Sequence, residues 1–578
     1  LAPDTKPFVL GRIPDEDPEV QVVESQFMWW NSESQSNWRD GYVRASLLLR
    51  DESLLKKTKD YVEHILRTQE EDGYLGIYSP ELRYRHTTEN GELWAQSTLF
   101  RVLLGYYEAA GDQRVKQALL KGADSVMRGY PIEASDPFHA ADSFAGLCHG
   151  LTIVDAFNGL YRLTGEEKYL DYATWLYQNY SANSLSEADM QKQSLESADA
   201  FFKGHGVHTY EHIRAVTIAA FHRPKEYART LDLLLAKLPY YLTMSGGPIG
   251  DEWVFARTAN STTTGYEFCS VLELFDSYAL LAEKTGDLAW GDAMEWLYFN
   301  AGLGMKHPEN GSIMYCKTDN CYEAARHRQP GDERPDNRYM YSPLHRKTAV
   351  CCVPNMGRLT PHYVQYMYQA SDNGIDILLF GPGELNHNVQ GNPVRIRQKT
   401  EYPADGTITV EVEVEKPVDM VLRIRKPKWA AGCILPEGAV EQDGVIVLGT
   451  HWKGRTALMV TFEMEITLKQ DFTKEYGVAR GPLLYAMPIR HREETLVEFP
   501  VAPFAEIECH AAEKIPLSYQ LCTKRLADFQ YRRAPGHHWT EQGIDGVFRD
   551  GSKICRCGLV PMGGTVLRKT SFAGTSRR

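Results

Sequence analysis

The chain has 578 residues, of which 43% are hydrophobic and 24% are charged, and its formal net charge is −13. This length exceeds a single compact core, so we expect two to four domains of ordinary globular composition. The acidic balance argues against nucleic acid as a partner, because phosphate binding requires clustered Lys and Arg, and the sequence has no run of about 18 uncharged apolar residues that would span a membrane.

The chain starts at Leu1 rather than at Met. This start fits a mature product whose export signal has been removed, and it fits a trimmed chain equally well. We therefore expect either a periplasmic or secreted protein or a cytoplasmic one. The sequence does not indicate the oligomeric state.

Residues from about 38 to 370 have the pattern of paired helices. Apolar side chains recur every three to four residues in several segments, as expected for helices that bury one face. These segments are residues 43–50, 54–66, 93–107, 151–163 and 271–281. A last helix is predicted near residues 358–368.

Five similar turns separate these helices. They are centred on Asp51, Asp112, Glu166, Lys225 and Asp287, at successive steps of 61, 54, 59 and 62 residues. A Gly in such a turn ends one helix in the left-handed conformation, and an acid favours the N-terminus of the next. A period near 60 residues with two helices per repeat is typical of stacked helical hairpins. We predict six hairpins closed into an (α/α)6 barrel, with an open solenoid as the alternative.

The pattern changes after Ala370. Short segments then alternate or run apolar, and Pro and Gly punctuate them, which is typical of a β-sandwich. These segments are residues 375–379, 407–414, 420–424, 445–448 and 457–467. The predicted domains are therefore an (α/α)6 barrel catalytic domain at 1–374, a β-sandwich domain at 375–490 and a smaller C-terminal β-rich domain at 491–578.

Cys351 and Cys352 are adjacent, and Glu267 and Cys269 form a Glu-x-Cys pair upstream. Neighbouring thiols do not easily bond to each other, because a disulfide needs Cβ atoms that converge to about 3.8 Å. Three thiolates and one carboxylate are a ligand set that Zn²⁺ accepts in tetrahedral geometry. The spacing alone is a weak zinc signal, and two buried, inert cysteines are the plain alternative.

Two further loops carry polar and aromatic side chains. Glu252 and Trp253 end a Gly-rich loop, and His205 and His208 lie in another. A lone Glu in a loop is usually solvated surface, and a lone His is more often structural than a ligand. The combination of such loops on successive hairpins nevertheless favours a functional site.

At these residues the chain resembles the β-L-arabinofuranosidase family of glycoside hydrolases, family 127. The resemblance rests on Asp251-Glu252, on residues 266–269, and on residues 349–355 with Arg358. It continues into residues 402–406, 422–429 and 479–485 of the predicted sandwich. In all it covers residues from about 38 to 485.

The resemblance implies a retaining exo-hydrolase that removes a terminal β-L-arabinofuranose-like sugar from plant polysaccharide. Cys351 would be the nucleophile and Glu252 the general acid/base. Glu267, Cys269, Cys351 and Cys352 would hold Zn²⁺. Metal ligation deprotonates a thiol that, with a pKa of about 8.5, is otherwise only a few per cent thiolate at neutral pH.

The resemblance also implies a set of sugar-binding residues. They are His208, His205, Glu92, Trp94 and Trp253. Family members often carry Gly-His-Leu on the helix that begins with the Glu-Leu-aromatic step, whereas this chain has Ser97-Thr98-Leu99. This departure bears on the identity of the substrate sugar more than on the type of reaction. Another L-furanose or an acidic branched sugar of pectin is the alternative, with Arg214 or Lys203 pairing its carboxylate.

Two other functions stay open on the sequence. An (α/α)6 barrel sugar epimerase or polysaccharide lyase would use His or Tyr as its base and no thiolate. A non-catalytic carbohydrate-binding or structural zinc protein would bind a glycan without cleaving it. An oligosaccharide or polysaccharide partner is expected for the hydrolase.

Overall fold

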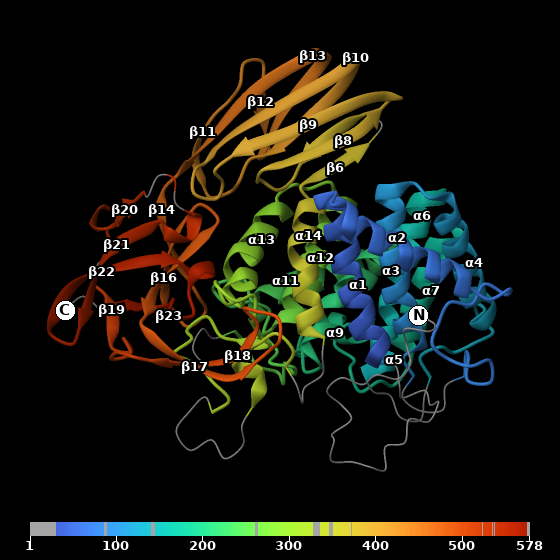
Figure 1. Ribbon diagram of the computed structural model, residues 1–578, viewed down its shortest axis with the longest axis horizontal. Coiled ribbons are helices and arrows are strands. Elements are labelled where there is room, and N and C mark those ends of the chain that lie inside the picture. Colours follow the sequence, from blue (N-terminus) through green and yellow to red (C-terminus); the bar gives the residue numbers. More distant parts are fainter. Residues whose placement is uncertain are drawn as a thin grey trace.

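The structure is a computed structural model that describes residues 30–85, 90–139, 145–259, 264–327, 336–345, 351–371, 373–522, 524–533, 536 and 538–574. A helical ring occupies one half, a sheet region covers one end of the ring, and a second sheet region lies beside it (Figure 1). The chain start and residues 349–350 of the cysteine motif lie outside the described residues.

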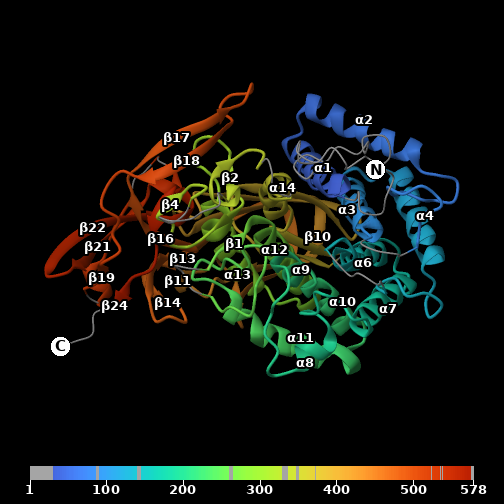
Figure 2. The ribbon, with the colours of Figure 1, turned by 90° about the horizontal axis from the view of Figure 1, so that it is seen from below.

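Six helices form the inner wall of the ring (Figure 2). Each contacts the next along the chain, and the last contacts the first, so the ring is closed and the alternative of an open solenoid is wrong. The inner helices are α1 (Trp30–Leu49), α3 (Glu92–Ala110), α6 (Ile153–Thr164), α10 (Ile213–His222), α12 (Phe268–Thr285) and α14 (Cys352–Gln365). The predicted barrel is confirmed.

In the part of the chain that the structure describes, five helices lie outside the inner wall, each reached through one of the predicted turns. They are α2 (Glu52–Thr68), α4 (Gln113–Gly129), α7 (Lys168–Ala182), α11 (Pro224–Lys237) and α13 (Trp290–Trp296). Gly111, Gly165 and Gly286 end inner helices with φ of 65°, 72° and 66°, a left-handed conformation that Gly adopts without strain. The Asp51 and Asp112 side chains accept backbone N–H groups at the starts of α2 and α4.

The sixth hairpin differs from the prediction. The expected helix at 358–368 begins earlier, at Cys352, and ends at Gln365. Tyr368 already belongs to β6 (Tyr368–Ser371), which pairs with β7 (Gly374–Ile377). Among the described residues α14 therefore has no outer helix, and the chain passes from the ring directly into the sheet.

Short elements connect the main ones. They are α5 (Ala145–His149), η2 (Gly150–Thr152), α8 (Lys192–Glu196), α9 (Gly206–Glu211), η3 (Leu238–Tyr241), β1 (Tyr266–Glu267), η4 (Leu297–Gly302), β2 (Ile313–Met314), β3 (Cys316–Lys317), β4 (Glu323–Ala324), η5 (Asn337–Tyr339) and β5 (Tyr341–Ser342). No described helix combines the length and the apolar character that a membrane crossing needs.

An eight-stranded sheet region covers the C-terminal ends of the inner helices (Figure 1). Besides β6 and β7 it contains β8 (Gly383–Val389), β9 (Asn392–Thr400), β10 (Thr407–Arg425), β11 (Ala430–Ile434), β12 (Val440–Gln442) and β13 (Val445–Met464). Strands β10 and β13 pair antiparallel along their length, with an irregularity between Val414 and Val418. The predicted segments 407–414 and 420–424 are thus one strand, because the residues between them form a bulge and not a turn.

A nine-stranded sheet follows. It contains β14 (Ile466–Gln470), β15 (Tyr476–Arg480), β16 (Leu483–Ile489), β19 (Tyr519–Leu521), β20 (Gln530–Arg532), β21 (Gly543–Asp550), β22 (Lys553–Pro561), β23 (Leu567–Lys569) and β24 (Ala573–Gly574). β17 (His491–Glu498) and β18 (Ala505–Ala511) instead pair with each other, and β18 also pairs with β4 and β5 of the ring. The domain boundaries at 374 and 490 stay predictions. Because β16, which precedes residue 490, pairs with β22, which follows it, we favour a second boundary before β14.

Candidate active site

The predicted ligand set converges at one end of the ring. Cys269 and Cys352 have their Sγ atoms 3.1 Å apart, and the Sγ atoms of Cys351 and Cys352 are 3.9 Å apart. Glu267 Oε1 lies 3.5 Å from the Sγ atoms of both Cys351 and Cys352. One ligand atom from each of the four residues lies within 4.8 Å of the others, and all four side chains are buried.

These separations fit a tetrahedral metal site. Zn–S bonds of about 2.3 Å and a Zn–O bond of about 2.1 Å place neighbouring ligand atoms roughly 3.6 to 3.8 Å apart. The second carboxylate oxygen, Glu267 Oε2, is buried and has no hydrogen-bond partner among the described residues, and His205 Nε2 is 3.8 Å from it. All three cysteines are free thiols, so they are available as ligands. The donor set and its spacing therefore fit a thiophilic divalent cation such as Zn²⁺.

The electrostatics of the cluster also favour a cation. Burial raises the pKa values of Cys269, Cys352 and Glu267. Hydrogen bonds from Cys269 and then Cys352 instead hold the pKa of Cys351 well below its ordinary value. On its own the cluster thus stabilises one thiolate, at Cys351, and a divalent cation would let the other groups ionise.

Two helix N-termini also stabilise negative charge on the side chains of this cluster. Glu267 is the N-cap residue of α12, and Cys351 is the N-cap residue of α14. The partial positive charge of a helix N-terminus stabilises a nearby thiolate or carboxylate. The parallel packing of the inner helices thus brings two such termini to the same site.

Glu252 lies beside this cluster on a strained loop. Its φ is 77°, which is rare for a residue other than Gly, and its carbonyl accepts the N–H of Gly206 at 2.6 Å. Its Oε1 accepts a hydrogen bond of 2.8 Å from Nε of Arg338, and it also forms an ion pair of 2.8 Å with Nη2 of the same guanidinium. Burial raises the pKa of Glu252, Arg338 opposes that rise, and the charge of Cys351 adds to it. A carboxyl group with a raised pKa is suited to donate a proton near neutral pH.

Tyr315 connects the two parts of the site. Its hydroxyl group is 3.2 Å from Cys351 Sγ, and the guanidinium of Arg338 lies 5.8 Å from the centre of its ring. The Tyr315 side chain is buried. It therefore helps fix the position of the Cys351 sulfur relative to the Glu252–Arg338 pair.

A second group of rings adjoins the thiols. Trp94 stacks on His149 with ring centres 4.4 Å apart, and His149 meets the edge of His208 at 3.7 Å. His205 lies 4.9 Å from His208 and 5.8 Å from the ring of Trp253. Carboxylates hold two of the histidines, since His149 Nδ1 is 2.8 Å from Glu211 Oε1 and His208 Nδ1 contacts Glu187.

Several polar atoms of this group are buried without a partner among the described residues. They are Nε1 of Trp94, Nδ1 of His205 and Nε2 of His208. Burial, and next the neighbouring His208, lower the pKa of His205 to about 3, so its ring is neutral. Unpaired buried donors and acceptors are costly unless a ligand satisfies them, and the hydroxyl groups of a sugar would do so.

Glu92 has a different environment from the other predicted sugar-binding residues. Its Oε1 accepts the Tyr74 hydroxyl at 3.0 Å, and its Oε2 accepts the Tyr84 N–H at 2.7 Å. Burial raises its pKa to about 7. The described contacts of Glu92 thus anchor the segment before α3, while Trp94, two residues on, reaches the histidines.

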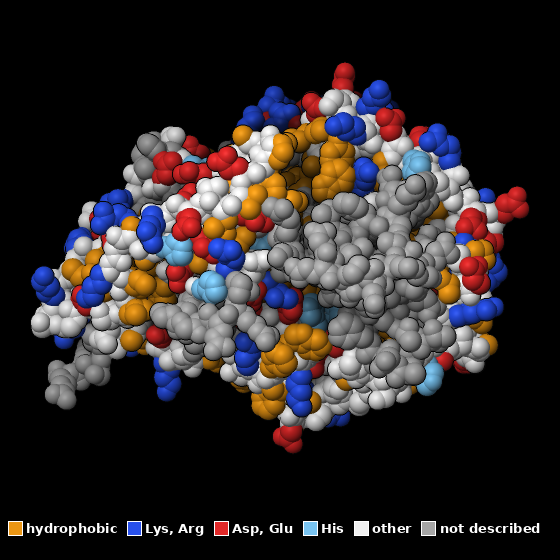
Figure 3. Space-filling model, turned by 60° about the horizontal axis from the view of Figure 1, so that its bottom comes forward, with side chains coloured by type: hydrophobic (Ala, Val, Ile, Leu, Met, Phe, Trp, Pro, Cys, Tyr) orange, Lys and Arg blue, Asp and Glu red, His pale blue; other side chains and the backbone are white. Residues whose placement is uncertain are grey.

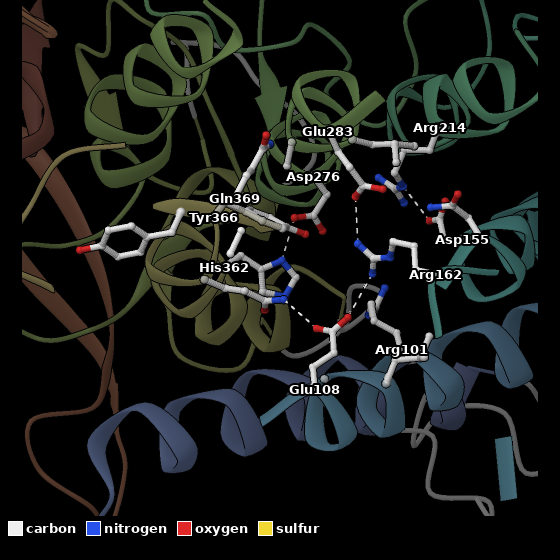
Figure 4. A pocket seen from close by; sticks show the side chains of 18 of the residues that line it. Arg101, Glu108, Asp155, Arg162, Arg214, Asp276, Glu283, His362, Tyr366 and Gln369 are labelled. Carbon is white, nitrogen blue, oxygen red and sulfur yellow. Dashed lines mark hydrogen bonds and ion pairs between the residues drawn. The ribbon is translucent and has the colours of Figure 1, made fainter. Parts of the chain in front are cut away.

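The opposite end of the ring holds another cavity, of about 600 Å³, under β6 and β7 (Figure 4). Ion pairs line it, such as Arg162–Glu283 at 2.9 Å, Arg214–Asp155 at 2.6 Å and His362–Asp276 at 2.7 Å. Arg214 is also bound to Glu273 at 2.7 Å, so it is already neutralised and does not face the thiols. Because the charged side chains that line this cavity pair with one another, we interpret it as a structural contact between the ring and the sheet.

Acidic and basic side chains are interspersed over the described part of the face in Figure 3. Neither sign forms a continuous field there. The expectation that the chain does not bind nucleic acid stays a prediction.

Sequence reasoning missed several members of the site. His149, Glu187, Glu211, Tyr315 and Arg338 all lie within or beside it, and none belongs to a motif that stood out. The exposed ring of Phe255, three residues after Glu252, stacks on Trp253 at 6.0 Å and was missed as well. Only the proximity of Phe255 to Glu252 offered a signal.

Comparison with known proteins gives two family matches. The model of the β-L-arabinofuranosidase GH127 catalytic domain matches residues 8–365, and that of the GH127 middle domain matches residues 374–464. No curated protein matches the chain in sequence.

Solved structures share the fold along almost the whole chain. A GH127 β-L-arabinofuranosidase from Geobacillus stearothermophilus T6 is 19% identical, with a TM-score of 0.71 over 96% of this chain and 91% of that one. A second GH127 β-arabinofuranosidase is 17% identical, with a TM-score of 0.69 over 97% and 90% of the two chains. At these identities the structures support the fold, and the family matches support the enzyme class.

Proposed function

The chain belongs to the GH127 β-L-arabinofuranosidase family and is a glycoside hydrolase, and on that premise we propose that it is a retaining exo-enzyme with Cys351 as nucleophile and Glu252 as general acid/base. Its substrate is a glycan that ends in a β-L-arabinofuranose-like residue. Another L-furanose or an acidic branched sugar of pectin falls within the same proposal.

The observation that carries the proposal is the pairing of one activated thiol with one protonatable carboxyl. Cys351 is the least buried of the four cluster residues, with 8% of its surface exposed, and its pKa is lowered by neighbouring thiols. The pKa of Glu252 is raised by burial. One group is thus poised to attack and the other to give up a proton at the same pH.

The reaction proceeds in two displacements. Cys351 Sγ attacks the anomeric carbon, the bond from that carbon to the leaving oxygen breaks, and Glu252 gives its proton to this oxygen. A water molecule then attacks the same carbon, Glu252 takes the water proton, and the carbon–sulfur bond breaks. Two inversions at one carbon retain the configuration.

The four cluster residues Glu267, Cys269, Cys351 and Cys352 would hold a zinc ion. When bound, the ion supplies a positive charge that keeps the thiols deprotonated in a buried site. Asn355 donates a hydrogen bond of 3.2 Å to Cys269 Sγ and thereby orients one ligand.

The sugar ring would occupy the space beside the histidines. His205, His208 and Trp94 offer buried polar atoms without partners, and Trp253 and Phe255 provide flat faces near Glu252. Aromatic faces pack against the C–H faces of sugars. Phe255 would accordingly lie under the leaving group.

The test is hydrolysis of an aryl β-L-arabinofuranoside by Cys351→Ala and Glu252→Gln. We expect losses of about 10²- to 10⁴-fold in kcat for Glu252→Gln and at least as much for Cys351→Ala. Cys316→Ala, a buried thiol outside the cluster, is the matched control and should stay near wild-type activity. Wild-type turnover by both site variants, or first release of the inverted anomer in an NMR time course, would refute the proposal.

A further inference from the structure

A cavity of about 670 Å³ lies where three parts of the molecule meet. Its walls come from η3 and α13 of the ring, from Lys428 and Trp429 before β11, and from β14 with the turn after it. Figures 1 and 2 both show α13, β11 and β14 beside one another. Because α13 is an outer helix, the cavity opens outside the ring and is separate from the thiol site.

Aromatic side chains line part of this cavity. Trp296 and Trp429 line the cavity together with Phe472. Phe472 stacks on Tyr240 of η3, with ring centres 5.2 Å apart and planes 19° from parallel. Both rings of that stack are 53% exposed. Exposed paired rings at the rim of a cavity are a typical surface for packing the C–H faces of sugars.

The polar groups of the cavity include one donor without a partner among the described residues. Trp429 Nε1 is buried and has no hydrogen-bond acceptor among the described residues. An indole N–H can only donate, so an acceptor oxygen is needed to satisfy it. A sugar hydroxyl or carboxylate would supply that oxygen.

The charge of the cavity favours an acidic ligand. Lys428 and Lys469 both line it, and neither forms an ion pair with a described carboxylate; Lys469 instead lies 5.5 Å from the ring centre of Trp296. The neighbouring Asp292 is engaged by Arg425 and by the Lys428 N–H at 3.2 Å. Asp471 also lines the cavity, so with Asp292 held by Arg425 the two lysines leave an excess of one positive charge there, in a chain whose net charge is −13.

We propose that this cavity is a second carbohydrate site, which binds a uronate-containing oligosaccharide segment away from the active site. The rings would pack against sugar faces, and the lysines would pair with uronate carboxylates. The proposal goes beyond the hydrolytic reaction and does not depend on which residues perform it. This second site would keep the enzyme bound to an acidic polysaccharide while terminal sugars are removed.

The test measures binding of trigalacturonate by calorimetry to the full chain carrying Cys351→Ala, with neutral arabinotriose as the comparison. Phe472→Ala and Lys469→Gln change exposed side chains, so each should leave the melting temperature unchanged. We expect each to weaken trigalacturonate binding by at least about tenfold, the size expected for losing one stacked ring or one charge contact. Lys469→Gln should leave any binding of arabinotriose unaffected.

Phe221→Ala removes an exposed ring that does not line the cavity and is the matched control, with no expected change in affinity. The proposal is overturned if trigalacturonate does not bind, or if Phe472→Ala and Lys469→Gln bind it as tightly as the parent protein. Because Cys351 is already replaced in every sample, this result is independent of whether Cys351 is the nucleophile.

Discussion

Arg338 tunes the residue assigned as acid/base. It donates a hydrogen bond to Glu252, forms an ion pair with it, and is the main influence opposing the burial-driven rise of the Glu252 pKa. Glu252 must be protonated to donate to the leaving oxygen, so the rate should fall as the pH rises through the Glu252 pKa. A variant without the guanidinium should keep Glu252 protonated to higher pH.

We therefore expect Arg338→Gln to move the alkaline limb of kcat/KM to higher pH. The variant should also be slower at its optimum, by about tenfold or more, because the carboxyl group loses the partner that orients it. The measurement is the full pH–rate profile on an aryl arabinofuranoside. An alkaline limb that stays in place, or moves to lower pH, would contradict the assignment of Glu252 as the acid.

Glu92 offers a separate test at residue scale. Its pKa in the folded chain is raised to about 7, mainly by burial, above an unfolded value of about 4.3. Between these values the folded state binds the additional proton, so stability falls as the pH rises from about 4.3 to about 7, by at most roughly 4 kcal/mol. Glu92→Gln should remove this part of the pH dependence, as seen in urea unfolding at pH 5 and pH 8. An unchanged slope would mean that Glu92 ionises freely and is not the anchor inferred here.

At the scale of elements, the contact between α1 and α14 closes the ring. A Cβ at Gly41 of α1 would lie 2.7 Å from the backbone carbonyl carbon and oxygen of Gly357 in α14. A Cβ at Gly357 would meet nothing within 4 Å. Both glycines lie where α1 and α14 contact each other, but only Gly41 must lack a side chain for the two helices to pack this closely.

Two Gly→Ala substitutions should therefore change stability in opposite directions. Gly41→Ala forces the helices apart and should cost about 1 to 3 kcal/mol. Gly357→Ala only improves helix propensity and should gain up to about 1 kcal/mol. Urea unfolding of both variants checks this, and equal effects of the same sign would refute the closed contact between the two backbones.

The periodic parts of the chain could be predicted from sequence, because their signals are local. Gly111, Gly165 and Gly286 end helices through their own conformational freedom, and the apolar spacing between them sets the helices. The join of 407–414 to 420–424 was not predictable, since Lys416 and Pro417 resemble a turn until the long partner strand β13 is in place. The pairing of β10 with β13 therefore makes the two segments one strand.

The same distinction applies to the site. Cys351, Cys352, Glu267 and Cys269 stood out because their residue types are rare in such spacing. Arg338 and Tyr315 come from irregular segments after α13, and only the folded chain brings them to Glu252 and Cys351. Common residue types in irregular segments carry no local signal of function.

At the scale of the molecule, the cluster of four candidate metal ligands joins parts of the ring that are far apart in sequence. Glu267 and Cys269 lie at the start of α12, and Cys351 and Cys352 lie at the start of α14, the helix that packs against α1. A cation bound there would link the fifth and sixth inner helices next to the point of closure. Binding energy for the folded state alone adds directly to its stability.

We therefore expect the purified protein to contain zinc and a chelator to lower its melting temperature. At a free metal concentration of about 1,000 times the dissociation constant the ion contributes about 4 kcal/mol, which removal would forfeit. Cys352→Ser should melt lower than the parent, contain less zinc and no longer respond to the chelator, whereas Cys316→Ser, equally buried but outside the cluster, should respond as the parent does. Zinc content by mass spectrometry and melting curves with and without chelator make the comparison without any assay of activity. Equal zinc content in the two serine variants, or equal sensitivity of both to the chelator, would show that the ion does not bind at the thiols of α12 and α14.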